Sequence, residues 1–365
     1  MCFIIPYPPD YGGVFDLYNK IVALHSAGIH IHLHCFTEKV FENNLSDYCD
    51  EVFYYPRTTG LRGLSFNLPY IVSSRLSNTL VQRLNNDDHP VLIEGIHSTG
   101  FLLNKNLRHK KFALRLHNVE HVYYSLLAEA TRSTFKRLYF SIESRLLRNH
   151  ERSVAAKVDA IFAVSNSDAQ LYRSRFNAQK IIVLPVFIDF KAAAPAGRGC
   201  FCLYHGNLSV PENEKAAMWL LFNVFSLTEI PFIIAGKKPS RFLKRLVSKH
   251  PNVSLVAEPT NKMLEDLITK AQCHVLPSFN KTGIKLKLVH ALYRGRFCIV
   301  NEAAVEGTGL ESLCEQASNA VEFREKVTQC YNLDYTAEQA AVREQLLQSL
   351  FNQAQQVQTL IQWLS

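Results

Sequence analysis

The sequence predicts an α/β protein made of two doubly wound, Rossmann-like domains. The chain has 365 residues, which is too long for one ordinary core and suits two domains of roughly 150–200 residues each. Short apolar runs alternate with helical stretches through both halves, as in parallel sheets whose strands are connected by helices. Residues 191–199 (KAAAPAGRG) separate the two series, and this composition is typical of an interdomain linker. We therefore expect domains at 1–188 and 189–345.

The first half begins with a predicted strand at 2–5 (CFII), a loop, and a helix that Gly28 closes. The next strand, 29–36, alternates strictly and carries His30, His32 and His34. This spacing resembles a metal-binding triplet, but we interpret it as one face of an edge or partly exposed strand. Further apolar runs and an amphipathic pattern predict strands at 51–55, 90–95, 112–117 and 160–165 and a long helical region from Val122 to Ala156.

The second half repeats the strand–helix series. Apolar runs predict strands at 200–206, 231–236, 253–258, 273–278 and 297–301. Amphipathic stretches between them predict helices near 216–225, 240–249 and 263–271. The C-terminal tail from Ala337 is expected to form one or two amphipathic helices.

Bulk composition narrows the class of protein. An apolar fraction of 47% and a charged fraction of 20% are those of a well-packed protein. No apolar run approaches the ~18–20 residues that span a bilayer, and the N-terminus lacks the basic region of a signal peptide, so we expect a cytoplasmic protein. Nine cysteines in irregular spacing favour buried, reduced thiols over a disulfide framework. Cys200 and Cys202 lie too close together for a zinc pair, and no metal site is expected.

The formal net charge of +8 is unevenly spread, because Lys and Arg are concentrated between Lys105 and Lys157. This pattern fits either a solvated helical face or contact with anionic lipid headgroups or an anionic acceptor. No nucleic-acid motif accompanies the charge, so we do not expect a nucleic-acid partner.

Chemistry is expected in the loops that follow strands, because ligands of open parallel sheets bind beyond the carboxyl ends of the strands. The first such loop, residues 8–13, ends in Gly12 and Gly13 before a helix start, where free N–H groups can bind an anion or a sugar. Two histidines, His97 and His117, each follow a predicted strand. They fit either hydrogen bonding and proton transfer at a sugar hydroxyl or structural histidines at strand ends.

Three loops of the second half combine glycines with cations. Gly206 and Asn207 follow one strand with Lys215 close by, and Gly236 and Lys237 follow the next. The chemistry of a diphosphate requires this concentration of positive charge and N–H donors. After the strand that ends at Ser278, Gly283 is predicted to open a helix whose first turn holds Lys285 and Lys287. Cations there are unfavourable alone, which points to a bound anion or to tertiary contacts.

These segments resemble glycosyltransferase family 4. Its donor-binding half is similar to residues 204–217 (YHGNLSVPENEKAA), 235–240 (AGKKPS) and the run 282–310 that begins TGIKLKLVHAL. Its acceptor half is similar to residues 6–13 (PYPPDYGG) and 114–124 (LRLHNVEHVYY). The combination of these segments is most similar to bacterial enzymes that build lipopolysaccharide, capsule or related glycans.

The resemblance implies the GT-B fold, in which two Rossmann-like domains face a central cleft and a C-terminal helix, here 346–365, returns to the first domain. It implies a retaining, metal-independent transferase without a cofactor, whose donor substrate is a nucleotide-diphosphate sugar. The donor would bind 189–345, and a glycan or lipid-linked acceptor would bind 1–188 at the inner face of a membrane. His117 would position the reacting sugar, and Lys215 would stabilise the departing phosphate.

The remaining implied contacts divide between donor and acceptor. The donor would contact Gly12, Gly13, Gly206, Asn207, Gly236, Lys237, Ser278, Thr282, Gly283, Ile284, Lys285, His290 and Glu306. The acceptor would contact Asp10, Tyr11, His97 and Asn118.

The sequence departs from the family at two places. Family members often carry two glutamates separated by seven residues, and these positions read Thr282 and His290. Asn207 also stands where a phosphate-binding arginine is usual. Two alternatives therefore remain beside the transferase: a catalytically weak GT-B-like scaffold subunit of a glycan assembly complex, and a nucleotide-sugar epimerase, which needs acid/base carboxylates that the sequence does not reveal.

Overall fold

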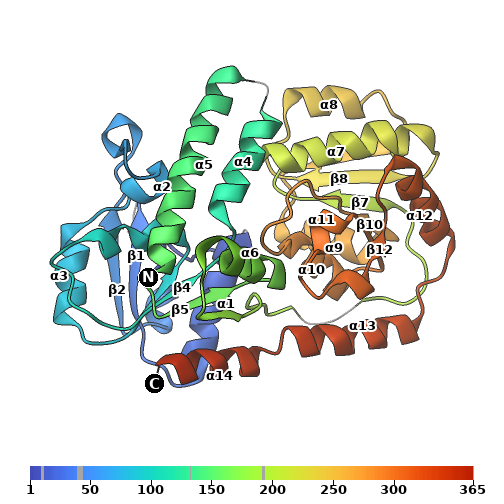
Figure 1. The fold of residues 1–365 in the computed structure, drawn as a ribbon. Coiled ribbons are helices and arrows are strands. Elements are labelled where there is room, and N and C mark those ends of the chain that lie inside the picture. Colours follow the sequence, from blue (N-terminus) through green and yellow to red (C-terminus); the bar gives the residue numbers. More distant parts are fainter. Residues whose placement is uncertain (10–11, 39–43, 132, 191–193, 365) are drawn as a thin grey trace. The chain divides into compact units, whose positions relative to one another are not determined.

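The computed structural model describes residues 1–9, 12–38, 44–131, 133–190 and 194–364 (Figure 1). The chain forms two compact units. Unit 1 consists of Met1–Asp189 together with Phe351–Ser365, and unit 2 consists of Phe190–Leu350. The predicted acceptor residues Asp10 and Tyr11 lie outside the described residues.

Unit 1 is built on parallel strands. β1 (His32–Thr37) pairs with β2 (Glu51–Pro56), and a four-stranded sheet has the order β3 (Val91–Glu94), β4 (Phe112–Arg115), β5 (Ala160–Ala163), β6 (Ile181–Val183). Cys2 forms parallel bridges to Cys35 of β1 and to Glu94 of β3, so it occupies the place between the two sheets.

The prediction of a strand over 2–5 was wrong in extent. Only Cys2 pairs in the sheet, and the chain bends at residues 3 and 4. The carbonyl of Phe3 accepts a hydrogen bond from Nε of Arg75 at 3.0 Å, and the Phe3 ring stacks on His97. These tertiary contacts outweigh the β preference of a short apolar run.

The helices of unit 1 are α1 (Gly12–Ser26), α2 (Tyr70–Ser73), α3 (Asn78–Asn86), α4 (Glu120–Ala130), α5 (Thr134–Ala155), α6 (Asn166–Phe176) and α14 (Gln353–Leu364). The predicted single helical region from Val122 to Ala156 is in fact the pair α4 and α5, which pack against each other (Figure 1). The hydroxyl of Ser133 caps α5 by accepting from the N–H of Lys136, and a new N-cap marks a helix start.

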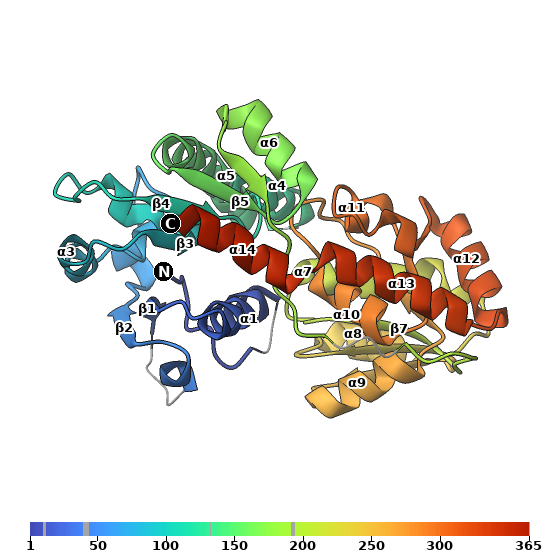
Figure 2. The same cartoon turned by 90° about the horizontal axis from the view of Figure 1, so that it is seen from below.

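The C-terminal helix α14 packs in unit 1 beside α1 (Figure 2). Val357 and Leu360 join a buried cluster with Leu184 and Phe187, and Trp363 meets Phe162 of β5 edge-on at 6.1 Å. Burial of this apolar face, rather than helix propensity, holds a helix of 12 residues in place.

Unit 2 contains one six-stranded parallel sheet. Its strands in chain order are β7 (Cys202–His205), β8 (Phe232–Gly236), β9 (Val253–Ala257), β10 (Cys273–Val275), β11 (Phe297–Val300) and β12 (Glu315–Gln316), and their spatial order is β12-β11-β10-β7-β8-β9. The order reverses between β7 and β10, which are neighbours. Such a switch point is where ligands bind in open α/β sheets.

The helices of unit 2 are α7 (Pro211–Asn223), α8 (Arg241–Val247), α9 (Asn261–Lys270), α10 (Leu286–Arg294), α11 (Glu302–Val305), α12 (Ala320–Asn332) and α13 (Ala337–Leu350). The prediction that Gly283 opens a helix was wrong, because α10 begins at Leu286. Gly283 has φ +68, a left-handed conformation that no α-helix continues. None of the described helices is long and apolar enough to cross a bilayer.

Candidate active site

In unit 1, a buried group of charged side chains surrounds His117. This group, called here the His117 cluster, consists of Asp16, Lys20, Glu94, Arg115 and His117. The Lys20 ammonium lies 2.8 and 3.0 Å from the two carboxylate oxygens of Glu94 and 3.3 Å from Asp16. Nε2 of His117 lies 3.0 Å from Glu94, and its Nδ1 lies 3.7 Å from Asp16.

The cluster balances its charges without bulk water. Two carboxylates face two fixed cations, because Arg115 adds a contact of 3.5 Å to Asp16, and these four residues are at most 4% exposed. Burial alone would raise the pKa of both carboxyls, but Lys20 and its cationic neighbours outweigh burial and hold the pKa of Asp16 and of Glu94 below their ordinary values. Both carboxylates are therefore ionised at neutral pH.

The same geometry decides what the cluster holds. Asp16, Glu94 and His117 lie close enough together to surround a cation, but the Lys20 ammonium already occupies both carboxylates. A divalent ion would face that ammonium at contact distance, so the residues do not fit a metal. The carboxylates instead orient the His117 ring, as carboxylates commonly do for functional histidines.

His97 and Phe3 lie beside His117. The His97 and Phe3 rings stack with centroids 4.6 Å apart, and the His117 ring meets Phe3 edge-on at 5.8 Å. Burial lowers the pKa of His97 well below its ordinary value, so the ring is neutral and its buried Nδ1 has no partner among the described residues. Gly95 makes this approach possible, since a Cβ there would lie 3.1–3.5 Å from all three rings.

The other predicted residues of unit 1 lie at the starts of helices. Gly12 and Gly13 begin α1, and a Cβ on Gly13 would meet the Phe3 ring at 3.8 Å. Asn118 is half-buried ahead of α4 and hydrogen-bonds the Glu120 side chain. Burial and the neighbouring Glu151 raise the pKa of that Glu120 carboxyl to about 8.

Sequence reasoning missed four members of the His117 cluster. Glu94 and Arg115 are charged residues inside otherwise apolar strands, and Asp16 and Lys20 are four residues apart on one helix. Charge in a buried strand is uncommon unless it is paired. That pattern was visible in the sequence, but the pairing of Lys20 with Glu94 spans 74 residues.

In unit 2, the loops after β7 and β8 touch through two glycines. The N–H of Gly206 donates to the carbonyl of Ala235 at 3.1 Å, and a Cβ on Gly236 would lie 2.0 Å from the carbonyl oxygen of Gly206. Position 236 therefore accepts only glycine. Lys237 continues this contact, because its carbonyl accepts the N–H of Leu208 at 2.9 Å.

Asn207 makes its hydrogen bonds within its own loop and the start of α7. Its side-chain oxygen accepts from the N–H and the hydroxyl of Ser209 at 3.1 and 2.7 Å, and its carbonyl accepts from Asn213 at 2.9 Å. The residue is exposed. The loop offers glycine backbone and an ordered turn ahead of α7.

The loop after β10 is held from three sides. The Ser278 hydroxyl lies 3.0 Å from a Glu212 oxygen, and the Ser278 N–H donates to Asn301 at 2.8 Å. Thr282 is buried and bonds Asn280 through its N–H and its hydroxyl. Ser278 and Thr282 thus lie in one ordered loop, which also contains Gly283 and Ile284.

Three lysines lie around this edge of the sheet. The Lys215 ammonium lies over the Phe279 ring, 4.5 Å from its centroid, and Lys285 donates to the carbonyl of Thr282 at 2.6 Å. Lys287 donates to the Tyr204 hydroxyl at 3.1 Å and to Asn213 at 2.9 Å. Burial lowers the pKa of Lys287 to about 8. Lys215 lies on the second turn of α7, which begins at Pro211.

His290 lies among aromatic and imidazole rings. It stacks on Phe190 with centroids 4.5 Å apart and meets His205 edge-on at 6.4 Å. Burial lowers the pKa of His290 to about 4, and its buried Nε2 has no partner among the described residues. Glu306 lies 3.1 Å from Lys281, so its carboxylate is paired at the rim of the loop.

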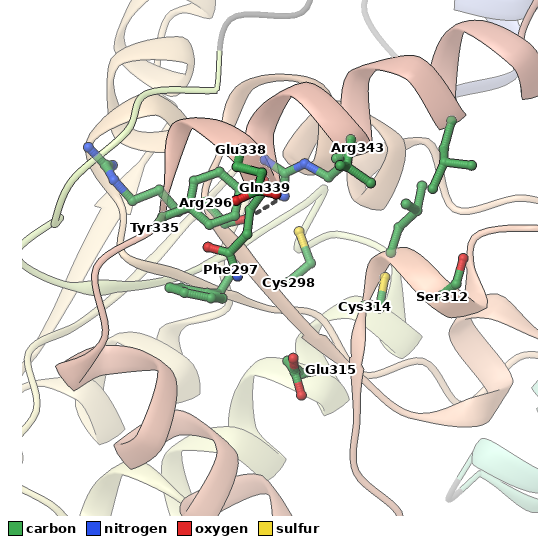
Figure 3. A pocket seen from close by; sticks show the side chains of 13 residues that line it. Arg296, Phe297, Cys298, Ser312, Cys314, Glu315, Tyr335, Glu338, Gln339 and Arg343 are labelled. Carbon is green, nitrogen blue, oxygen red and sulfur yellow. Dashed lines mark hydrogen bonds between the residues drawn. The ribbon is translucent and has the colours of Figure 1, made fainter.

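The pocket drawn in Figure 3 is separate from these loops. It has a volume of about 350 Å³ and lies at the beginning of β11 and β12. Its two arginines bind backbone: Arg343 donates to the carbonyls of Gly295 and Arg296, and Arg296 donates to those of Gly197, Thr269 and Ala271. Their role is to hold the surrounding segments together.

Comparison with known proteins decides the class. Residues 200–332 match the family described as Glycosyl transferases group 1. The chain carries a glycosyltransferase group 1 domain. It is therefore an enzyme of the glycosyltransferase class, and the matched segment contains every unit 2 residue that was predicted to bind the donor.

Comparison with solved structures identifies the fold. The structure of HepE from Anabaena, in complex with UDP and glucose, superposes with a TM-score of 0.67 at 12% identity, covering 99% of this chain and 98% of that chain. TarM superposes with a TM-score of 0.59 at 12% identity over 78% of this chain, and this chain covers 57% of TarM. The fold is GT-B, as predicted.

One relative is similar along most of the sequence. A Klebsiella pneumoniae protein described as an uncharacterized 44.6 kDa protein in the cps region is 26% identical over 322 residues, which are 83% of this chain and 82% of the relative.

Proposed function

We propose that this enzyme is a retaining, metal-independent member of glycosyltransferase family 4. In this proposal it moves a sugar from a nucleotide-diphosphate donor to a glycan or lipid-linked acceptor in bacterial surface polysaccharide synthesis, and it needs no cofactor. The observation that carries the proposal is the close approach of Gly206 and Gly236 at the carboxyl ends of β7 and β8, where β7 borders the switch point of the unit 2 sheet. The UDP and glucose named with HepE and the cps region named with the Klebsiella relative support it.

The donor side of the proposal rests on charge. A departing nucleotide diphosphate develops negative charge, and preorganised cations and N–H groups stabilise that charge without a metal ion. Lys215 and Lys285 provide ammonium groups, and Lys287 remains mostly charged at neutral pH because its pKa is about 8. Gly206 is half-buried after β7, and because it has no side chain, phosphate oxygens can approach its backbone.

The acceptor side rests on the His117 cluster. Glu94 orients the His117 ring from one side and Asp16 lies near its other nitrogen. In the proposal the edge of the His117 ring, whose side chain is 12% exposed, hydrogen-bonds the transferred sugar, with His97 and Asn118 near the acceptor. This assigns His117 a positioning and proton-sharing role.

We also propose that unit 1 contacts an anionic membrane surface at the cytoplasmic side. Phe135, Leu138 and Ile142 are 81%, 62% and 51% exposed and share one face of α5, since they are three and four residues apart. Exposed Arg145, Arg148 and Arg152 follow on the same helix. Apolar side chains flanked by cations are typical of helices that lie in a membrane interface.

Calorimetric binding of UDP, GDP and their sugar conjugates, without added metal, tests the donor assignment. We expect one nucleotide series to bind with micromolar affinity. Lys215→Ala should weaken that binding and reduce turnover by at least ~10²-fold, as loss of a transition-state charge partner does. Lys249→Ala, which removes an exposed lysine of α8's C-terminal flank, is the matched control. Normal turnover in Lys215→Ala would remove Lys215 from the mechanism.

The scaffold alternative has its own supporting observation. Neither position of the family's glutamate pair offers a carboxylate, because the residues there are Thr282 and His290. Thr282 hydrogen-bonds Asn280, and the His290 ring stacks on Phe190. Glu306 is paired with Lys281. Absence of binding by every nucleotide in the calorimetric series would favour the scaffold.

A further inference from the structure

Unit 1 contains a second polar site, a pocket of about 440 Å³ where α4, α5 and the end of α6 meet. Side chains that donate hydrogen bonds dominate its lining: Ser125, Ser141, Arg145, Arg148, Arg175 and His121. We propose that this pocket binds a phosphate group. The inference goes beyond the proposed glycosyl transfer and does not depend on it.

The first support is concentrated, uncompensated positive charge. Arg145 and Arg148 come from α5 and Arg175 from α6, and no acidic side chain lines the pocket. Within the described part of the chain, none of the three guanidinium groups has a hydrogen bond or an ion pair. Three like charges around one hollow repel each other unless an anion lies between them.

The second, independent support is the imidazole of His121. This side chain is 7% exposed, and its Nδ1 lies 2.5 Å from a carboxylate oxygen of the fully buried Glu151. The Ser144 hydroxyl donates to the His121 carbonyl at 2.7 Å. His121 is therefore held at its backbone carbonyl and at Nδ1 of its ring. The buried Nε2 has no partner among the described residues.

A buried polar nitrogen without a partner requires an explanation in a folded protein, and for His121 the three arginines that line the same pocket supply one, an anion bound among them. Because Nδ1 is taken by Glu151, a ligand oxygen is the partner that Nε2 lacks. A phosphate with one protonated oxygen suits it, since such an ion both donates and accepts hydrogen bonds.

The geometry of the helices favours a tetrahedral oxyanion. Ser141, Arg145 and Arg148 are spaced i, i+4 and i+7, so they share one face of α5, while Arg175 approaches from another helix. A phosphate monoester carries about −1.5 to −2 charges at neutral pH and three acceptor oxygens. Donors from two helices and the serine hydroxyls can reach several of these oxygens at once.

Binding of inorganic phosphate to the full chain, measured by calorimetry, is the first test. Arg145→Gln/Arg148→Gln should weaken the affinity at least tenfold. Lys136→Gln/Lys180→Gln removes the same charge from exposed positions of unit 1 and should leave the affinity within about twofold. Phosphate should also shift the ¹⁵N resonance of His121 Nε2, assigned with His121→Gln.

Two results would overturn the proposal: no phosphate binding up to roughly 10 mM, or equal weakening in both double variants, which would indicate general electrostatic attraction. Thermal melting of each variant shows whether it is folded. Because these titrations contain no nucleotide sugar, their failure is independent of a failure of the proposed glycosyl transfer.

Vesicles then distinguish a lipid headgroup from a free phosphate. The probes are vesicles of phosphatidylcholine alone and of phosphatidylcholine with phosphatidic acid, whose headgroup is a phosphate monoester. If the ligand is a lipid, the affinity for phosphatidic acid vesicles will fall at least tenfold more in Arg145→Gln/Arg148→Gln than in the control variant. Equal vesicle binding by both variants, together with the expected phosphate titration, would assign the pocket to a free phosphate.

Discussion

The His117 cluster allows a sharp test of how unit 1 is stabilised, by replacing Glu94 with Gln. The substitution keeps the size of the side chain but removes one of two carboxylates that face Lys20 and Arg115. The cluster then holds two cations and the single charge of Asp16. Leaving one buried charge without its partner costs about 3–5 kcal/mol, and the surroundings of Lys20 offer no water to replace it, because Lys20 is 2% exposed.

A double-mutant cycle separates pairing from burial. Lys20→Met and Glu94→Gln should each destabilise unit 1 strongly, but together they should cost less than the sum by about 2 kcal/mol or more, since the double variant removes both charges of the pair. Glu129→Gln, at an exposed position of α4, is the control and should change stability by less than about 0.5 kcal/mol.

The chain offers a convenient probe for this measurement. It contains two tryptophans, and Trp363 packs on Phe162 in unit 1 whereas Trp219 packs on Phe323 in unit 2. In a Trp219→Phe background, fluorescence during urea denaturation reports unit 1 alone, which matters because a two-unit chain need not unfold in one step. Single-variant costs below about 1 kcal/mol with an additive double variant would refute the reasoning.

Two further predictions concern unit 2, read from Trp219 in a Trp363→Phe background. The pKa of His290 is about 4 in the folded state against about 6.5 unfolded, so the unfolded chain binds more protons between these values and stability falls as pH falls below 6.5. When the pH is lowered from 7.5 to 5, the free energy of unfolding of the parent should therefore fall by about 2 kcal/mol more than that of His290→Asn. Parallel pH profiles of the two proteins would contradict this. Gly236→Ala should cost more than about 3 kcal/mol because its Cβ meets the Gly206 carbonyl at 2.0 Å, whereas Gly206→Ala, whose Cβ meets only Asn213 at 3.5 Å, should retain stability. Similar losses in both alanine variants would exclude the proposed contact.

Much of the fold could be predicted from local pattern. Apolar runs located β2, β3, β4, β5 and the strands β7 to β11 of unit 2 within a few residues, because strand-length apolar segments between turn residues have few other uses. The two-residue strand β12 was not predicted. The boundaries failed where a cap or a left-handed residue intervened. Ser133 starts a new helix inside the predicted region from Val122 to Ala156, and Gly283 delays α10 to Leu286.

The candidate site was predicted in part. The positions of the loops follow from strand ends, so Gly206, Gly236 and Ser278 could be named from the sequence. Their roles as donor-binding residues, and that of His117 in the transfer, stay predictions. The partners of His117 were not predicted, because they come from α1, β3 and β4, which are separated in the sequence.

The sequence by itself determined the class of fold, the order of its elements and the loops in which chemistry is sought, because periodicity and turn residues act over a few positions. Only the tertiary structure decided which charges meet. Lys20 reaches Glu94 across 74 residues, and His121 and Arg175 come to one pocket from two helices. The order of strands in a sheet and the packing of helices on it set these contacts, and both depend on burial of the whole core rather than on any local segment.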